Sequence, residues 1–133
     1  MSRLSGETAV VTGASKGIGK AIAERFAEEG ANVVTNSRSS ERAREAAEGI
    51  EDDGGRAIGV AADVSEYEEV ERLVDETVAE FGSLDVMVNN AGITDIKPAV
   101  EFEPEEWREV IDVDLNGVFF GAQVAAKRMI DQG

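Results

Sequence analysis

The sequence predicts an α/β fold in which one parallel sheet is covered by helices on both faces. Two observations predict it: short apolar segments alternate with longer segments of helical periodicity, and turn-forming glycines separate them. Right-handed crossovers then give a doubly wound, Rossmann-like sheet, for which we expect the strand order 3-2-1-4. The 133 residues are enough for one domain, residues 1–133, with a real core.

The first half of the chain contains three expected strands and two expected helices. The strands are predicted at residues 8–11, 32–36 and 56–62, and the helices at residues 17–29 and 40–50. Apolar residues recur every four positions from Ile18 to Phe26, which predicts an amphipathic first helix that Gly30 ends. Either Ser39 or Ser40 is expected to cap the second helix.

The second half begins with a predicted capping box, in which Ser65 and Glu68 satisfy amide groups at the start of a third helix. This helix is expected to end at Gly82 and to be followed by a fourth strand at residues 84–88. After a loop, Pro104 is expected in the first turn of a long final helix.

The composition excludes several classes of function. The chain carries 28 acidic and 13 basic residues, a net charge of −15, which would repel nucleic acid and anionic membranes. It has no cysteine and no histidine, so we expect no disulfide, no imidazole catalysis and no metal site. No apolar run approaches the roughly 18 residues of a membrane span or resembles a signal peptide, and a cytoplasmic location is expected.

A glycine-rich turn follows the first strand, with Gly13, Gly17 and Gly19 in the pattern Gly-x-x-x-Gly-x-Gly. This pattern is not a P-loop, because Ala21 cannot bind magnesium, and it is not Gly-x-Gly-x-x-Gly, because Ile22 stands where the last glycine belongs. A turn with little side-chain bulk at a helix N-terminus still exposes backbone N–H groups to a phosphate. The alternative is a tight turn without a ligand.

Two motifs resemble the short-chain dehydrogenase/reductase family. Thr12-Gly13-Ala14-Ser15-Lys16-Gly17-Ile18-Gly19 is similar to that family's cofactor loop, and Asn89-Asn90-Ala91-Gly92 is similar to its Asn-Asn-Ala-Gly motif. The resemblance covers the whole chain as the N-terminal portion of such a protein, truncated before the family's later strands. It is strongest to members that reduce 3-oxoacyl groups or oxidise glucose, other sugars and secondary alcohols.

The resemblance implies a nicotinamide dinucleotide cofactor. It implies that the cofactor contacts Gly13, Ser15, Lys16, Gly17, Ile18, Gly19, Arg38, Ser39, Asp63, Val64, Asn90, Ala91 and Gly92. Asp63 and Val64 would line the adenine, and Asn90 to Gly92 the ribose next to the nicotinamide. Two alternatives stay open: Asp63 could bond backbone amides near Ser65, and the Asn-Asn-Ala-Gly turn could be ordinary loop chemistry.

The end of the second strand favours NADP, with NAD as the other possibility. An acid that binds the ribose 2′-hydroxyl is expected about 20 residues beyond the loop, but no acidic residue lies between Ala31 and Ser40. Arg38 stands there instead and can form two hydrogen bonds to a 2′-phosphate, with Lys16 as a second cation. The alternative is that both are solvated surface charges.

The resemblance implies hydride transfer to or from a carbonyl carbon, with a Tyr acid/base, a Lys that lowers its pKa, a Ser that holds the substrate oxygen, and an Asn that anchors a water. The chain ends before the Ser strand and the Tyr-x-x-x-Lys helix. Its one tyrosine, Tyr67, does not form this motif, because Glu71 stands four positions later where the motif requires a lysine. Asp114 occupies the family's usual Asn position and Asn116 lies two residues later, so either is a candidate. Gly117 would ease a helix distortion there; the alternative is that both residues only pack or cap.

Three hypotheses follow for the function. The first is the cofactor-binding part of an NADP-dependent reductase with a small-molecule substrate, which as given binds cofactor without turnover. The second is a non-catalytic dinucleotide-binding sensor or partner subunit, and the third is a nucleotide triphosphatase with an aberrant P-loop. Because residues 86–88 would form an unpaired apolar edge, we expect a homo-oligomer or a marginally stable chain.

Overall fold

The computed structural model describes residues 2–133 and contains one four-stranded parallel sheet. The strands are β1 (Thr8–Val11), β2 (Asn32–Ser37), β3 (Arg56–Ala61) and β4 (Val86–Val88). Their order is β3-β2-β1-β4, so the predicted order 3-2-1-4 is confirmed. In the register of the sheet, Val10 of β1 lies between Val34 of β2 and Met87 of β4.

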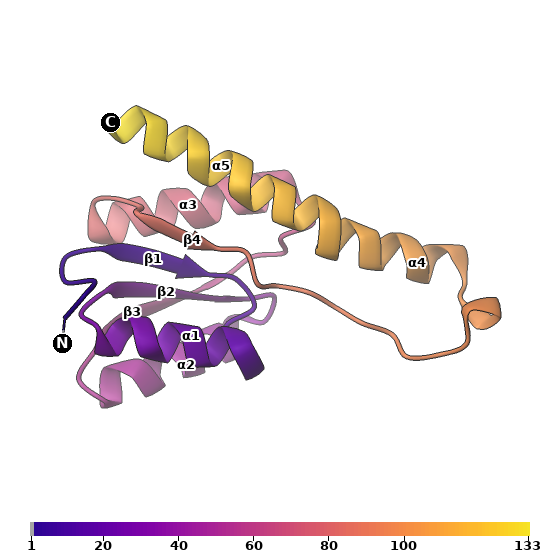
Figure 1. Cartoon of the computed structure of the whole chain (residues 1–133), viewed down its shortest axis with the longest axis horizontal. Helices are drawn as coiled ribbons and strands as arrows, with labels where there is room; N and C mark the ends of the chain where they lie inside the picture. The colour runs from indigo at the N-terminus through magenta and orange to yellow at the C-terminus, as the bar shows by residue number, and fades with distance from the viewer. Residues whose placement is uncertain (1) are drawn as a thin grey trace.

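Helices cover both faces of this sheet, as predicted for a doubly wound fold (Figure 1). They are α1 (Gly17–Glu28), α2 (Ser40–Asp52), α3 (Tyr67–Phe81), α4 (Pro104–Ile111) and α5 (Gly117–Gln132), with a short 3₁₀ helix at Ala99–Glu101. Figure 1 shows α1 and α2 on one face and α3 and α5 on the other, while α4 extends beyond the sheet. Within residues 2–133, no helix combines the length and apolar character that crossing a membrane requires.

The core consists of two layers because successive strand residues point to opposite faces of the sheet. Val10 and Val34 belong to the cluster under α3 and α5, which also contains Leu73. Val11 and Val33, each one residue away, belong to the cluster under α1 and α2. The two central strands, β1 and β2, are therefore buried on both sides.

The predicted capping box at Ser65 is wrong. Helix α3 begins at Tyr67, and the residue before it, Glu66, makes no side-chain cap. The Ser65 hydroxyl instead donates to the Asp63 carboxylate at 2.7 Å, and the Ser65 N–H donates to the same oxygen at 3.0 Å. An aspartate two residues upstream thus forms a local turn that takes the hydroxyl away from the helix.

The capping box of the second half lies at α4. Pro104 occupies the first turn, as predicted. The Glu103 carboxylate accepts the backbone N–H of Glu106, and the Glu106 carboxylate accepts the backbone N–H of Glu103. Glutamate is an unusual residue at this position, which is why the sequence pattern did not indicate it.

The long final helix is divided by a π-helical turn, Asp112–Asn116, between α4 and α5. A distortion beside Gly117 was expected, and the structure places it directly before that residue. A Cβ at Gly117 would lie 2.7 Å from a methyl group of Val64, so glycine allows the helix to pack against the segment after β3. Glycine is needed here for close packing as well as for flexibility.

The fourth strand is shorter than predicted and lies at the edge of the sheet. Leu84 is fully buried but outside the strand, because its N–H and C=O both bond the Gln132 side chain at 2.9 Å. Within residues 2–133, strand β4 has β1 as its single neighbour in the sheet. Its other edge offers unpaired backbone groups to another chain.

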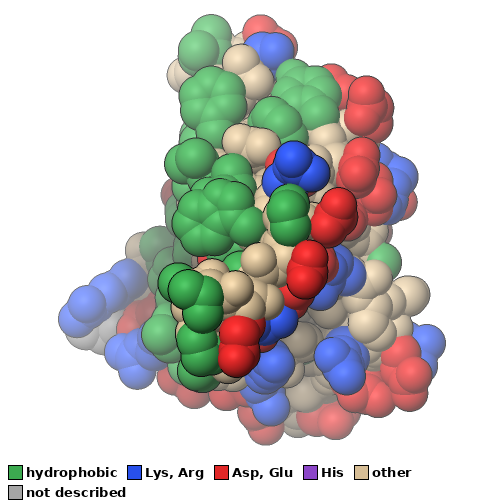
Figure 2. All heavy atoms as spheres, turned by 90° about the vertical axis from the view of Figure 1, so that its right-hand side faces the viewer, with side chains coloured by type: hydrophobic (Ala, Val, Ile, Leu, Met, Phe, Trp, Pro, Cys, Tyr) green, Lys and Arg blue, Asp and Glu red, His purple; other side chains and the backbone are tan. Residues whose placement is uncertain are grey.

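Exposed apolar side chains gather on one face of the molecule (Figure 2). Figure 2 shows hydrophobic side chains gathered in a band along one side of the molecule, next to rows of acidic and basic side chains. The exposed large hydrophobic residues of the second half of the chain are Ile96, Val100, Trp107, Leu115, Val118, Phe119 and Ile130. Exposed apolar patches of this kind are typical of association surfaces.

We predict that the chain self-associates through this face. Phe119 is 60% exposed, and replacing it with glutamate would place a charge in the contact. The variant Phe119→Glu should weaken association about tenfold or more, since burying a phenylalanine contributes roughly 1.5–3 kcal/mol. Sedimentation velocity over a concentration series measures this change.

Gly49→Glu is the matched control, because it adds the same charge on α2 where a side chain has open space. It should sediment as the parent chain does. A cooperative monomer at every concentration would contradict the prediction.

Candidate functional site

A cleft of about 580 Å³ opens at the carboxyl ends of the strands, where doubly wound sheets bind ligands. The structure brings together in it twelve of the thirteen residues predicted to bind a cofactor: Gly13, Ser15, Lys16, Gly17, Ile18, Arg38, Ser39, Asp63, Val64, Asn90, Ala91 and Gly92. The cleft also contains six residues that sequence reasoning did not assign: Asn36, Ser37, Arg42, Ala62, Ile93 and Val113.

The glycine-rich turn forms one wall of the cleft. Gly13 and Gly17 have φ angles of +63° and +60°, which L-residues with a side chain rarely adopt. A Cβ at Gly13 would also lie 2.8 Å from Cα of Ala91. The turn after β1 therefore needs glycine for its conformation and for its contact with the turn after β4.

Thr12 joins these two turns. Its hydroxyl oxygen accepts the N–H groups of Asn90 and Ala91, both at 2.9 Å, and the hydroxyl donates to Val88 O at 3.3 Å. Thr12 is almost fully buried, so these bonds are shielded from water. One side chain thus fixes the Asn-Asn-Ala-Gly turn against the end of β1.

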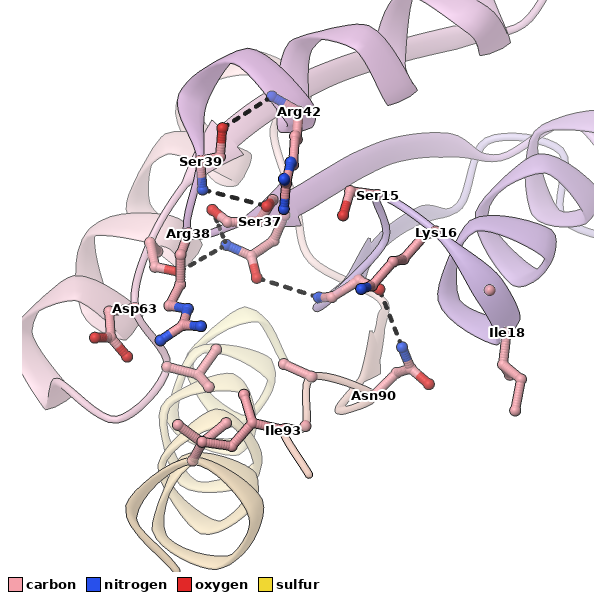
Figure 3. A pocket seen from close by; sticks show the side chains of 18 residues that line it. Ser15, Lys16, Ile18, Ser37, Arg38, Ser39, Arg42, Asp63, Asn90 and Ile93 are labelled. Atoms are coloured by element: carbon pink, nitrogen blue, oxygen red, sulfur yellow. Dashed lines mark hydrogen bonds between the residues drawn. The ribbon is translucent and has the colours of Figure 1, made fainter. Parts of the chain in front are cut away.

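Gly19 is the predicted residue that does not line the cleft. It lies in the first turn of α1, where an added Cβ would overlap the carbonyl oxygen of Gly13 and the side-chain amide of Asn90. The Asn90 amide donates to Thr12 O at 3.2 Å and Gly13 O at 3.1 Å, and Figure 3 shows it aimed at the turn. Gly19 therefore makes room for the residue that holds the turn in place.

Asn36 supports the turn from β2 and is one of the residues that sequence reasoning missed. Its side-chain oxygen accepts the Gly13 N–H at 3.3 Å, and its amide donates to Val60 O at 3.1 Å and Ala62 O at 3.2 Å. The sequence did contain a signal, because Asn36 is a polar residue at the end of an apolar strand. In the structure its side chain is only 2% exposed. Buried polar side chains require such partners.

Basic side chains gather in this cleft although the chain as a whole is strongly acidic. Lys16, Arg38 and Arg42 line it, and Asp63 is the one carboxylate among its described lining residues. Ser39 caps α2 by accepting the Arg42 N–H at 3.2 Å, which decides between the two serines. Arg42 lies in the first turn of α2, and the cap at Ser39 places this turn beside the cleft (Figure 3). The sequence left the cap position open and so did not indicate Arg42.

The structure confirms that Asp63 bonds Ser65, while its contact with an adenine stays a prediction. Asp63 lines the cleft, and one of its carboxylate oxygens bonds Ser65 through the backbone N–H and the hydroxyl. Glu69 accepts the Asp63 N–H at 3.0 Å, which fixes the segment further. These hydrogen bonds fix the position of the Asp63 carboxylate in the lining of the cleft.

Asp114 and Asn116 lie in the π-helical turn, and within residues 2–133 the lining of the cleft includes neither. Asp114 accepts the Ile93 N–H at 2.8 Å and so holds the segment that follows the Asn-Asn-Ala-Gly turn. Asn116 is directed along its own helix, where its amide donates to Asp112 at 3.1 Å. Asp114 is thus hydrogen-bonded to a residue of the cleft lining.

A glycine turn at a helix N-terminus, locked to an Asn-Asn-Ala-Gly turn on the neighbouring strand, agrees with the comparison by sequence. The family model described as "short chain dehydrogenase" matches residues 7–133. The chain belongs to the short-chain dehydrogenase/reductase family. The resemblance stated from Thr12–Gly19 and Asn89–Gly92 is therefore confirmed.

Curated relatives in this family are similar in sequence to almost the whole length of the chain. A 3β-hydroxysteroid dehydrogenase of Eggerthella lenta is 50% identical over 97% of the chain, and a glucose 1-dehydrogenase of Bacillus subtilis is 49% identical over 96%. A 3-oxoacyl-[acyl-carrier-protein] reductase of Synechocystis is 42% identical over 99%. The chain spans about half the length of these relatives: 50%, 50% and 54%.

Solved structures of short-chain dehydrogenases show the same fold. One from Mycobacterium marinum is 39% identical and superposes with a TM-score of 0.93 over 97% of the chain and 52% of its own. Another, from Burkholderia cenocepacia, is in complex with NADP and has a TM-score of 0.88 at 39% identity, over 95% of the chain and 52% of its own.

We predict that Gly19→Ala destabilises the fold because the new methyl group displaces the Gly13 carbonyl or the Asn90 amide. Forcing a methyl group into a packed site costs about 1–3 kcal/mol. Urea denaturation measures the free energy of unfolding.

The matched control is Gly49→Ala, a helical glycine with open space around the new methyl group. It should stabilise the chain by about 0.5–1 kcal/mol through helix propensity. Equal stabilisation by both substitutions would show that the turn does not depend on Gly19.

Proposed function

We propose that this chain forms the dinucleotide-binding part of an NADP-dependent short-chain oxidoreductase. The reaction is hydride transfer to or from a ketone, 3-oxoacyl or secondary alcohol substrate. The names of the curated relatives, a hydroxysteroid dehydrogenase, a glucose dehydrogenase and a 3-oxoacyl reductase, support this class of chemistry. When bound, the cofactor supplies or accepts the hydride, and the residues of this chain bind and orient it.

The cleft fits a dinucleotide. The glycine turn leaves the N-terminus of the 12-residue helix α1 open to a pyrophosphate, where backbone N–H groups and the helix dipole favour negative charge. No Cβ projects from Gly13 or Gly17 into this space, and Lys16 lies beside it. Asp63, Val64 and Val113 would face the adenine, and Asn90 to Gly92 the nicotinamide ribose.

The observation that supports NADP most directly is the charge at the end of β2. Arg38 and Arg42 line the cleft there, and the segment from Ala31 to Ser40 contains no carboxylate to bind a ribose 2′-hydroxyl. A guanidinium can form two hydrogen bonds to a phosphate, which makes Arg38 the residue we assign to the 2′-phosphate.

The one tyrosine of the chain lies in a different groove, between α3 and α5. Its hydroxyl accepts a hydrogen bond from Lys127 at 3.1 Å, and this bond raises the pKa of the Lys127 ammonium. Tyr67 and Lys127 share the groove with Val74 and Val124 and are absent from the described lining of the dinucleotide cleft. We therefore propose that residues 1–133 bind the cofactor without turnover, which a sensor or partner subunit would also do.

We predict that Arg38→Ala weakens NADPH binding about 10- to 100-fold and leaves NADH binding nearly unchanged. A hydrogen bond to a charged group contributes about 1.5–3 kcal/mol, and only NADPH carries the 2′-phosphate. Enhancement of nicotinamide fluorescence measures both dissociation constants on the 133-residue chain.

Arg44→Ala is the matched control, since Arg44 lies on α2 outside the cleft and pairs with Glu48 at 3.4 Å. It should leave both constants unchanged. Equal losses for NADPH and NADH in Arg38→Ala would show that Arg38 does not recognise the phosphate. Binding of ATP with magnesium in place of either nucleotide would support the triphosphatase hypothesis instead.

A further inference from the structure

Arg38 is paired with a carboxylate on the opposite side of the cleft. Its Nη1 lies 3.8 Å from Oε1 of Glu109, and the two side chains are 57% and 60% exposed. Arg38 follows β2, whereas Glu109 belongs to α4, so the pair connects two elements far apart in the sequence. Figure 3 shows Arg38 extending away from Ser39 toward the long helix, while Arg42 stays beside Ser37.

Glu109 lies at the rim of the dinucleotide cleft because of its spacing on the helix. It precedes Val113 by four residues, and Val113 is 5% exposed and lines the cleft. Residues four apart in a helix share a face and lie about one turn from each other. The Glu109 carboxylate therefore stands one turn above the cleft wall and faces the guanidinium assigned to the 2′-phosphate.

We propose that Glu109 is a specificity-determining residue that limits how strongly the cleft prefers NADP over NAD. This inference rests on the proposed function, in which Arg38 binds the 2′-phosphate. Glu109 and the phosphate compete for the same guanidinium, and the negative charge of Glu109 also repels the incoming phosphate. NAD carries no 2′-phosphate, so neither effect acts on it.

Neighbouring carboxylates are held by other partners and do not have this role. Glu106, one turn before Glu109 on α4, is bound by Lys97 and accepts the Glu103 N–H at 3.1 Å. These bonds keep the pKa of the Glu106 carboxyl below its usual value, chiefly through the Lys97 ammonium. Asp63 bonds Ser65 and lines the cleft beside the adenine position, where its charge acts on both nucleotides alike.

The expected effect is modest because both side chains are largely exposed. Pairs of this kind contribute little, and their removal changes an equilibrium by about twofold to fivefold. Solvent ions screen the interaction, so the effect should shrink as the salt concentration rises. A change of this size adjusts the preference for NADPH but does not outweigh the larger contribution expected from Arg38.

The test measures the dissociation constants of four ligands for the wild-type chain and for the variant Glu109→Gln. NADPH and adenosine 2′,5′-bisphosphate carry the 2′-phosphate, whereas NADH and adenosine 5′-diphosphate lack it. Glu80→Gln is the matched control, because Glu80 is exposed at the end of α3 and the substitution removes the same charge. The double variant Arg38→Ala/Glu109→Gln shows whether the effect passes through Arg38, and isothermal titration calorimetry gives each dissociation constant.

Glu109→Gln should bind NADPH and the 2′,5′-bisphosphate about twofold to fivefold more tightly and leave the other two ligands unchanged. Glu80→Gln should change none of the four dissociation constants. In the Arg38→Ala background, Glu109→Gln should tighten NADPH binding by a smaller factor than it does in the wild-type chain. If the wild type binds NADPH but Glu109→Gln shows no gain, an equal gain for all four ligands, or a loss, the inference is wrong and the proposed function stands. If the wild type binds neither nicotinamide nucleotide, the proposed function is wrong, and the inference with it.

Discussion

The close contact between the turns after β1 and β4 is the constraint on which the rest of the site depends. Gly13 meets Ala91 so closely that a Cβ would lie 2.8 Å from its Cα, and the Thr12 hydroxyl and Asn90 amide bond across the same contact. These residues directly follow two adjacent parallel strands, whose carboxyl ends meet because β4 pairs with β1. The helix N-terminus, the open glycine turn and the cleft beside them all follow from this contact.

Cationic side chains gather in the cleft of a molecule that is acidic elsewhere. Lys16, Arg38 and Arg42 enter the cleft from the first turn and from the start of α2, although the net charge is −15. An anionic ligand in the cleft would therefore meet cationic side chains, in contrast to the acidic surface elsewhere. Glu109 belongs to that acidic surface, and its carboxylate lies 3.8 Å from the Arg38 guanidinium.

The long helix links the cleft to the apolar face. Its π-helical turn places Asp114 where it accepts the Ile93 N–H, and Gly117 lets the helix pack directly on Val64. The same helix exposes Leu115 and Phe119. The long helix therefore contributes Val113 to the lining of the cleft and exposed apolar side chains to the outer surface.

The sequence by itself determined the alternation of elements, the strand order and the place of both turn motifs, because periodicity and glycine positions act within a few residues. Only the tertiary structure decided the partners of Asn36, the entry of Arg42 into the cleft, the opposition of Arg38 and Glu109, and the packing role of Gly19. It also overturned the cap at Ser65, where Asp63 competes for the hydroxyl. These contacts join residues that crossovers bring together, such as Thr12 and Asn90 at a separation of 78 positions, so no local pattern in the chain specifies them.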